Sequence, residues 1–292
     1  MAVRREKKVD TSSYTVDVKT EIYTNANELV NDCKNRTVRH GAYTLTDAKI
    51  RSRSNWYGVP DYNAALELLN TGYQPVVNKL NEELKVTSKL GPRFAFSNEV
   101  QGFMPVIPLA LNGLPRCMLD VRVKPIKTKV LDIYYDMTAT SEKDVDDFIK
   151  AGKMLLGTIL ALESQGYKFN LYALQSYWDC RNYAKHAIDL LCVKVKSSDR
   201  PLDLKRISFP LTHPAFFRVI GFDWESKSPV TRYLGDGRGR SIRDDFSKED
   251  CEKIAKSMFG ENVFYLSCTE LINRNYDKES LKEVLTNAKI AC

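Results

Sequence analysis

The sequence predicts an α/β protein with three layers, in which helices cover a mainly parallel sheet and a helical hairpin precedes it. Segments of strand composition alternate with amphipathic helical segments from Val130 onward. One long helical stretch, Glu142–Gln165, lies between two strand-like runs, which is the order of a β-α-β unit. The hydrophobic fraction of 43% and charged fraction of 28% are ordinary for a soluble globular domain.

The first 90 residues are expected to form two regions that precede this domain. Residues 1–55 are polar and predict an N-terminal arm with one short helix near Asn25–Cys33. Within residues 56–90, Tyr62–Asn70 and Gln74–Leu84 both have helical periodicity. We expect these two helices to form the hairpin.

Residues 91–292 are expected to form the α/β domain. Its first part contains two segments of strand composition, Val106–Leu111 and Leu119–Lys124. Residues Asn112–Pro115 separate them with the glycine and proline content of a hairpin turn.

The β-α-β unit begins with the apolar run Val130–Tyr135. Its helix, Glu142–Gln165, ends before Gly166, where a left-handed residue is needed. The strand Lys168–Leu174 follows. Because a helix connects the two strands, they should be parallel with a right-handed crossover.

The second half continues the alternation. The expected elements are a strand Leu190–Lys196, a helix Pro214–Phe222, a loop Thr231–Arg243, a helix Lys248–Met258, a strand Asn262–Cys268 and a helix Lys278–Ala288.

The stretch KVLDIYYDMTATS, residues 129–141, carries the main functional question. In parallel sheets, ligands gather where strands end, and Asp136, Thr138 and Thr140 supply the oxygens that magnesium prefers. In the alternative interpretation, Thr140 or Ser141 caps the following helix and Asp136 accepts backbone hydrogen bonds in a turn. Ordinary capping accounts for one hydroxyl-rich turn, so we favour the cap.

This turn resembles the metal-ion-dependent adhesion site of von Willebrand factor A domains, which have a Rossmann-like fold. The family pattern Asp-x-Ser-x-Ser follows the first strand, and Asp136, Thr138 and Thr140 match it with threonine at both serine positions. The resemblance implies a Mg²⁺ ligand from a later loop, for which Asp199 is the candidate. Its neighbour Arg200 departs from the family's aspartate-glycine pair. The site is therefore expected to be degenerate.

Longer strings resemble an uncharacterised family encoded by bacteriophages and prophages. They are SNWYGVPDYNAALELLNTGYQP, FMPVIPLALNGLPRCM and ISFPLTHPAFFRVIGFDWE, between residue 54 and about residue 226. The resemblance implies a phage origin and a von Willebrand A-like core, and it carries no activity.

The net charge of +7 favours anionic partners weakly, because 37 acidic residues are mixed with 44 basic ones. Arg238, Arg240 and Arg243 lie in a basic, glycine-rich stretch and are the candidates for contact with nucleic acid or an acidic partner. We expect weak, salt-sensitive binding at most.

These observations favour a non-enzymatic phage protein that acts through protein–protein contacts, in virion structure or assembly, with phage or host proteins as partners. The alternatives are a metal-dependent nucleic-acid enzyme that uses Asp136 and a basic nucleic-acid-binding protein. Nuclease-like and phosphatase-like sites need a second carboxylate, and Thr138 stands where a phosphatase has aspartate. The seven scattered cysteines, without a CxxC pair, indicate reduced thiols. Without a signal-like or membrane-spanning segment, host cytoplasm or virion is the expected location.

Overall fold

A computed structural model describes residues 2–39, 44–87, 94–123, 130–178, 186–231, 241–273 and 276–287. The chain divides into two compact units. Unit 1 comprises residues 1–80 and 129–292, and unit 2 comprises residues 81–128. The sequence-based boundary at residue 91 therefore differs from the structural one, which falls inside a helix. Unit 2 is an insertion in the chain of unit 1.

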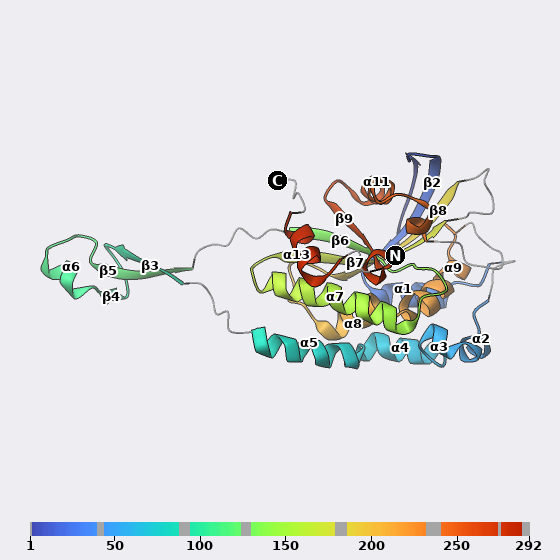
Figure 1. The fold of residues 1–292 in the computed structure, drawn as a ribbon, viewed down its shortest axis with the longest axis horizontal. Helices are drawn as coiled ribbons and strands as arrows, with labels where there is room; N and C mark the ends of the chain where they lie inside the picture. Colours follow the sequence, from blue (N-terminus) through green and yellow to red (C-terminus); the bar gives the residue numbers. More distant parts are fainter. Residues whose placement is uncertain are drawn as a thin grey trace. The chain divides into compact units, whose positions relative to one another are not determined.

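Unit 1 contains a six-stranded mixed sheet in the order β1-β2-β8-β7-β6-β9 (Figure 1). The pairs β2–β8, β7–β6 and β6–β9 are parallel, whereas β1–β2 and β8–β7 are antiparallel. The general α/β prediction is thus confirmed. The strands are β1 (Val3–Asp10), β2 (Thr15–Tyr23), β6 (Val130–Asp136), β7 (Lys168–Trp178), β8 (Ala187–Lys196) and β9 (Val263–Ser267).

The predicted β-α-β unit is present, and both of its strands are interior strands of this sheet. β6 and β7 are parallel, with Val130 opposite Lys168 and Asp136 opposite Leu174. Helix α7 (Val145–Glu163) connects them. Gly166 follows with a φ of 94°, a left-handed conformation that glycine adopts without strain. The central strand and its crossover helix were therefore predictable from periodicity.

The prediction of a polar N-terminal arm is wrong. β1 and β2 belong to the main sheet, and β2 pairs in parallel with β8. β1 is an edge strand whose side chains are exposed except for Val9, and charged residues are typical of such edges. Its polar composition therefore reflects its position at the sheet edge. The predicted short helix is found as α1 (Ala26–Asn35).

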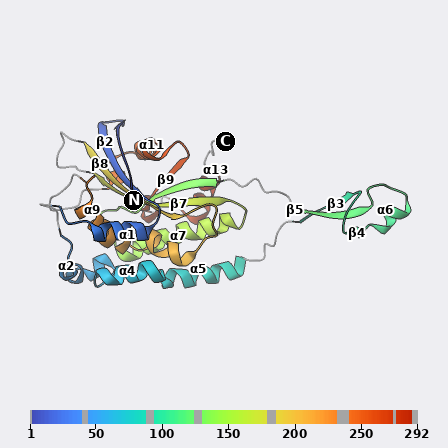
Figure 2. The ribbon, with the colours of Figure 1, turned by 180° about the vertical axis from the view of Figure 1, so that it is seen from behind.

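Helices cover both faces of the sheet (Figures 1 and 2). On one face, α11 (Lys248–Phe259) and α10 (Ile242–Asp245) pack on a core that includes Tyr134, Ile188 and Tyr265. On the other face lie α1, α7 and α8 (Leu204–Thr212). The remaining helices of unit 1 are α2 (Asp47–Ser52), α3 (Ser54–Tyr57), α4 (Tyr62–Thr71), the π-helix η1 (Phe216–Gly221), α9 (Phe222–Lys227), α12 (Cys268–Ile272) and α13 (Lys278–Asn287). The boundary between the two units falls within α5 (Gln74–Thr87).

The two helices of the expected hairpin exist, but they have a different arrangement. Figures 1 and 2 draw α4 and α5 one after the other in a line, without a reversal of direction. Gly72 between them has a φ of 77°, and a Cβ at this position would clash with the backbone of Lys205 at the start of α8. The junction between α4 and α5 is therefore fixed by a close approach to α8.

Unit 2 contains a three-stranded antiparallel sheet in the order β3-β5-β4. The strands are β3 (Phe94–Glu99), β4 (Met104–Pro105) and β5 (Met118–Val123). The predicted strand Val106–Leu111 is wrong, because residues Ile107–Leu111 form the short helix α6. Pro108 within the first two positions of α6 suits a helix start and cannot donate to a sheet ladder.

Among the helices of the described ranges, none is both long and apolar enough to cross a membrane.

Candidate functional site

Asp136 lies at the carboxyl end of β6, where the sequence placed it, but it is fully buried. Its carboxylate accepts hydrogen bonds from the Ser176 hydroxyl at 2.6 Å, the Tyr265 hydroxyl at 2.8 Å and the Thr138 amide at 3.0 Å. The donors come from β7, β9 and the turn after β6. Asp136 therefore joins three segments at one edge of the sheet.

Burial dominates the electrostatics of this aspartate. It raises the pKa of Asp136, while the hydrogen bonds from Ser176, Thr138 and Tyr265 act in the opposite direction. Burial also raises the pKa of the nearby Cys268 thiol well above its usual value. At this edge of the sheet, buried polar groups of neighbouring strands are hydrogen-bonded to one another.

The two threonines of the motif have different environments. The Thr138 hydroxyl is buried and accepts a hydrogen bond of 2.8 Å from the Ser176 amide. Thr140 is half-buried, and its carbonyl accepts from the Lys143 amide at 3.3 Å. Thr138 therefore belongs to the Asp136 network, and Thr140 begins the turn that leads to α7.

The helix cap was assigned to the wrong residue. Helix α7 begins at Val145, and Asp144 occupies the N-cap position. The Asp144 amide donates to the carboxylate of Asp147 at 3.3 Å, as in a capping box. Ser141 lies three residues earlier, where its carbonyl accepts from the Trp56 indole at 2.8 Å. Neither Thr140 nor Ser141 is the cap.

Asp199 lies at the opposite end of the sheet from Asp136. It follows β8, which is antiparallel to β7, so β8 ends where β6 and β7 begin. Lys196 at the end of β8 is opposite Leu171 and donates to the Phe169 carbonyl. The four residues Asp136, Thr138, Thr140 and Asp199 therefore do not converge on one ion. The prediction that Asp199 completes the ligand set of Asp136 is wrong.

The three arginines predicted to contact nucleic acid or an acidic partner are only partly described by the structure. Arg238 and Arg240 lie outside the described residues. Arg243 forms an ion pair of 3.0 Å with Glu270, and it also donates to the Phe246 carbonyl at 3.1 Å. This pairing, partly buried, raises the pKa of Arg243 against the opposing effect of desolvation. Arg243 therefore supports the local fold instead of facing an external phosphate.

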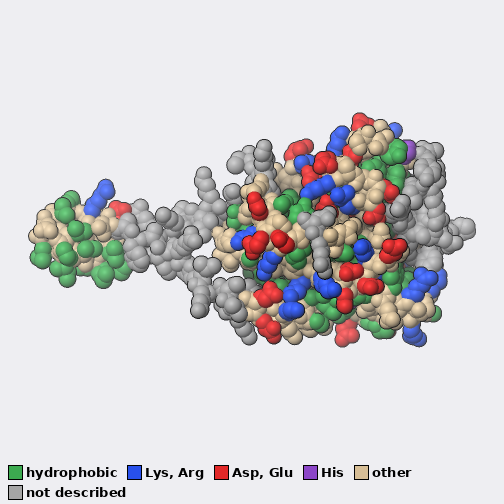
Figure 3. Space-filling model, viewed as in Figure 1, with side chains coloured by type: hydrophobic (Ala, Val, Ile, Leu, Met, Phe, Trp, Pro, Cys, Tyr) green, Lys and Arg blue, Asp and Glu red, His purple; other side chains and the backbone are tan. Residues whose placement is uncertain are grey.

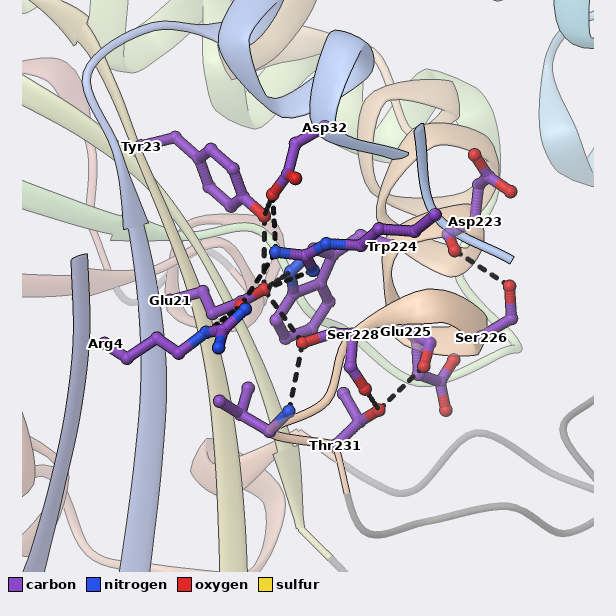
Figure 4. A network of polar contacts seen from close by, with 12 residues as sticks. Arg4, Glu21, Tyr23, Asp32, Asp223, Trp224, Glu225, Ser226, Ser228 and Thr231 are labelled. Atoms are coloured by element: carbon purple, nitrogen blue, oxygen red, sulfur yellow. Dashed lines mark hydrogen bonds and ion pairs between the residues drawn. The ribbon is translucent and has the colours of Figure 1, made fainter. Parts of the chain in front are cut away.

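A second buried network, which the sequence did not indicate, surrounds Glu21 of β2 (Figure 4). Arg36 binds its carboxylate with both terminal nitrogens at 2.8 and 3.0 Å, and Arg4 binds it at 2.8 Å. Trp224 and Ser228 donate at 2.7 and 2.8 Å. Burial alone would raise the pKa of Glu21, but these donors lower it to about 2.

This Glu21 network also fixes helix α1 against β2. The Tyr23 hydroxyl donates to Asp32 of α1 at 2.7 Å, and Arg36 pairs with Asp32 at 2.5 Å. The loop from Thr24 to Asn25 between strand and helix is therefore held at both ends. The sequence contains no signal for this network, because Glu21 has the same phase of the alternation as Asp17 and Lys19.

Arg218 is a third feature that sequence reasoning missed. It is fully buried in η1 and donates to the carbonyls of Trp56 at 2.5 Å and Lys143 at 2.8 Å. Its guanidinium lies over the Trp56 ring at 4.0 Å, a cation–π geometry. Burial lowers the pKa of Arg218 to about 10. The residue connects the segment before α4 with the loop before α7.

Unit 2 has the most unusual surface. None of residues 98–120 is buried, although their sequence is strongly apolar. Figure 3 shows hydrophobic side chains gathered over this unit. The apolar side chains that are about half or more exposed are Val100 (64%), Phe103 (62%), Met104 (49%), Ile107 (64%), Leu111 (82%) and Leu114 (48%).

The comparisons with known proteins identify a family whose function is unknown. Residues 7–290 match the family model described as "Domain of unknown function (DUF7192)". The match covers nearly the whole chain, so the protein belongs to this family. No curated protein and no solved structure matches the chain.

Proposed function

We propose that this protein is a non-enzymatic bacteriophage protein whose unit 2 binds another protein during virion structure or assembly. One observation carries the proposal: residues 98–120 contain no buried side chain and expose six large apolar ones. Apolar groups that lie together on an exposed surface are typical of a protein interface. We call these six residues the apolar surface of unit 2.

The energetics of so small a unit support this proposal. Burial of apolar area must offset the conformational entropy lost on folding, and units of about 50 residues do this marginally even with a core. Helix α6 has five residues and buries none of them. A helix of this length is unstable in water unless it is packed against something. A partner that covers Ile107 and Leu111 supplies that packing.

Other parts of the proposal rest on the sequence resemblances. The phage origin is supported by the three long strings, one of which lies in unit 2. The von Willebrand A-like core is supported by the parallel β6–α7–β7 unit and by Asp136 at the end of β6. The buried Asp136 network suits a scaffold more than a catalyst, because its carboxylate is enclosed by protein donors.

The test is quantitative capture of partners from phage-infected cells. The tagged wild type is compared with the double variant Ile107→Ser, Leu111→Ser, which removes two apolar side chains of α6. Val3 and Val38, 52% and 37% exposed in unit 1, provide the matched control Val3→Ser, Val38→Ser. We expect a virion or assembly protein to be captured by wild type and control and to fall at least about tenfold with the α6 variant. Equal capture by all three chains would contradict the proposal.

A further inference from the structure

The cavity at the carboxyl ends of β2 and β8 is separate from the Asp136 network and from unit 2. Because these two strands are parallel, their ends meet at one edge of the sheet. The chain leaves β2 through Thr24 and Asn25 into α1, and it leaves β8 through Ser197 and Asp199. The space between these two exits and α8 has a volume of about 380 Å³.

Two arginines that line this cavity, Arg200 and Arg206, have no carboxylate within ion-pair distance in the described part of the chain. Lys194 is a third cation of the lining, but its ammonium lies over the Tyr172 ring, 5.7 Å from the ring centroid. A fourth, Lys196, is neutralised by Glu163 at 2.7 Å. Like charges gathered on one concave surface attract an anion that can approach all of them.

The two acidic residues of the lining are already engaged. The Asp203 carboxylate accepts from the amides of Lys205 and Arg206 at the start of α8. Asp199 is exposed, and a hydrogen bond from Ser197 together with the charges of Arg200 and Lys194 lowers its pKa. Within the described residues, neither carboxylate forms an ion pair with Arg200 or Arg206.

The neutral part of the lining suits an organic group beside the anion. Leu69, Val195, Ile207 and Pro210 provide apolar atoms, while Thr24 and Ser197 provide hydroxyls. A volume of this size is within the range of small-molecule sites and exceeds what inorganic phosphate fills. The cavity therefore fits a molecule with an anionic end and a less polar body.

The walls of the cavity are held in place before any ligand arrives. The Glu21 network ties β2 to α1 through Tyr23 and Asp32, which Figure 4 shows side by side, and through Arg36. The Ser198 amide donates to the Asn170 side chain at 2.8 Å, which holds the exit of β8. Rigid walls lower the entropy lost on binding.

We propose that this cavity binds a small molecule that carries a phosphate monoester, with Arg200 and Arg206 around the phosphate and Leu69 and Ile207 against the organic part. Guanidinium groups favour such ligands because their planar donors match two phosphate oxygens at once. This site requires neither unit 2 nor a protein partner.

The test uses the full chain with inorganic phosphate, AMP and adenosine as probes, by calorimetry at constant ionic strength. Constant ionic strength removes general screening as an explanation. The variant Arg200→Gln, Arg206→Gln is compared with Lys34→Gln, Lys205→Gln, which changes the net charge equally at exposed positions outside the lining.

We expect AMP to bind at least as tightly as phosphate, and adenosine not to bind. The arginine variant should weaken AMP binding at least about tenfold, and the lysine control should change it less than about twofold. Absence of AMP binding to the wild type, binding of adenosine equal to that of AMP, or equal losses in the two variants would each overturn the proposal.

Discussion

The hydroxyl of Tyr265 on β9 donates a hydrogen bond of 2.8 Å to the carboxylate of Asp136 at the end of β6. Both residues are fully buried, and Ser176 of β7 donates to the same carboxylate from the other side. One side chain thus joins three neighbouring strands at their carboxyl ends. This arrangement makes Asp136 a structural centre whose loss is measurable.

Replacement of Asp136 by alanine should strongly destabilise the protein. The donors of Ser176, Tyr265 and Thr138 would remain buried without their acceptor, at a cost of about 3 kcal/mol or more. Tyr265→Phe removes only one of these hydrogen bonds and should cost about 1 kcal/mol. Urea unfolding at neutral pH measures both values. Equal stability of wild type and Asp136→Ala would contradict the network.

The capping assignment is tested by three single substitutions at the start of α7. Asp144→Ala should cost about 0.5–2 kcal/mol, because it removes the N-cap side chain. Thr140→Ala and Ser141→Ala should each change the free energy of unfolding by less than about 0.5 kcal/mol. A larger loss at Thr140 or Ser141 than at Asp144 would restore the sequence-based assignment.

Magnesium should have little effect on stability. A ligand that binds the native state raises its melting temperature, and the proposed ligand Asp199 lies at the other end of the sheet from Asp136. We therefore expect thermal melts in millimolar magnesium and in chelator to coincide. A magnesium-dependent increase that disappears in Thr138→Val would reveal a working site at the β6 edge.

Glu21 should contribute to acid denaturation. Its pKa is about 2 in the folded protein and 4.5 in the reference state, so its stabilisation is complete above pH 4.5 and is lost as the pH falls towards 2. This depression corresponds to roughly 3 kcal/mol. Between pH 6 and pH 2, the wild type should therefore lose about that much more stability than Glu21→Gln. Parallel stability curves for the two chains would show that the network does not hold a charged Glu21.

Periodicity was sufficient for β6, α7 and β7, because an apolar run, a long amphipathic stretch and a closing Gly166 agree with one another. It failed for β1, whose exposed charges at a sheet edge read as an unstructured arm. It also failed for α6, where IPLAL has no polar residue to show a helical period.

The site prediction failed because the observed strands are longer than the predicted ones. The predicted strands Lys168–Leu174 and Leu190–Lys196 are separated by 15 residues, 175–189, which is enough for a parallel connection. Only eight residues, 179–186, separate β7 from β8. A parallel connection needs a dozen or more, so β8 had to be antiparallel and Asp199 had to lie away from Asp136. The sequence contains no signal for Arg218 either, because a buried arginine with carbonyl partners contradicts the ordinary preference for exposure.

We propose that the apolar surface of unit 2 binds a partner protein. Amide hydrogen exchange, measured on the isolated chain and on the chain in its captured complex, tests it most directly. Residues 98–120 should exchange rapidly in the isolated chain and become at least about tenfold more protected in the complex, while the amides of β6 stay unchanged. Unchanged exchange across residues 98–120, with new protection confined to unit 1, would contradict the account.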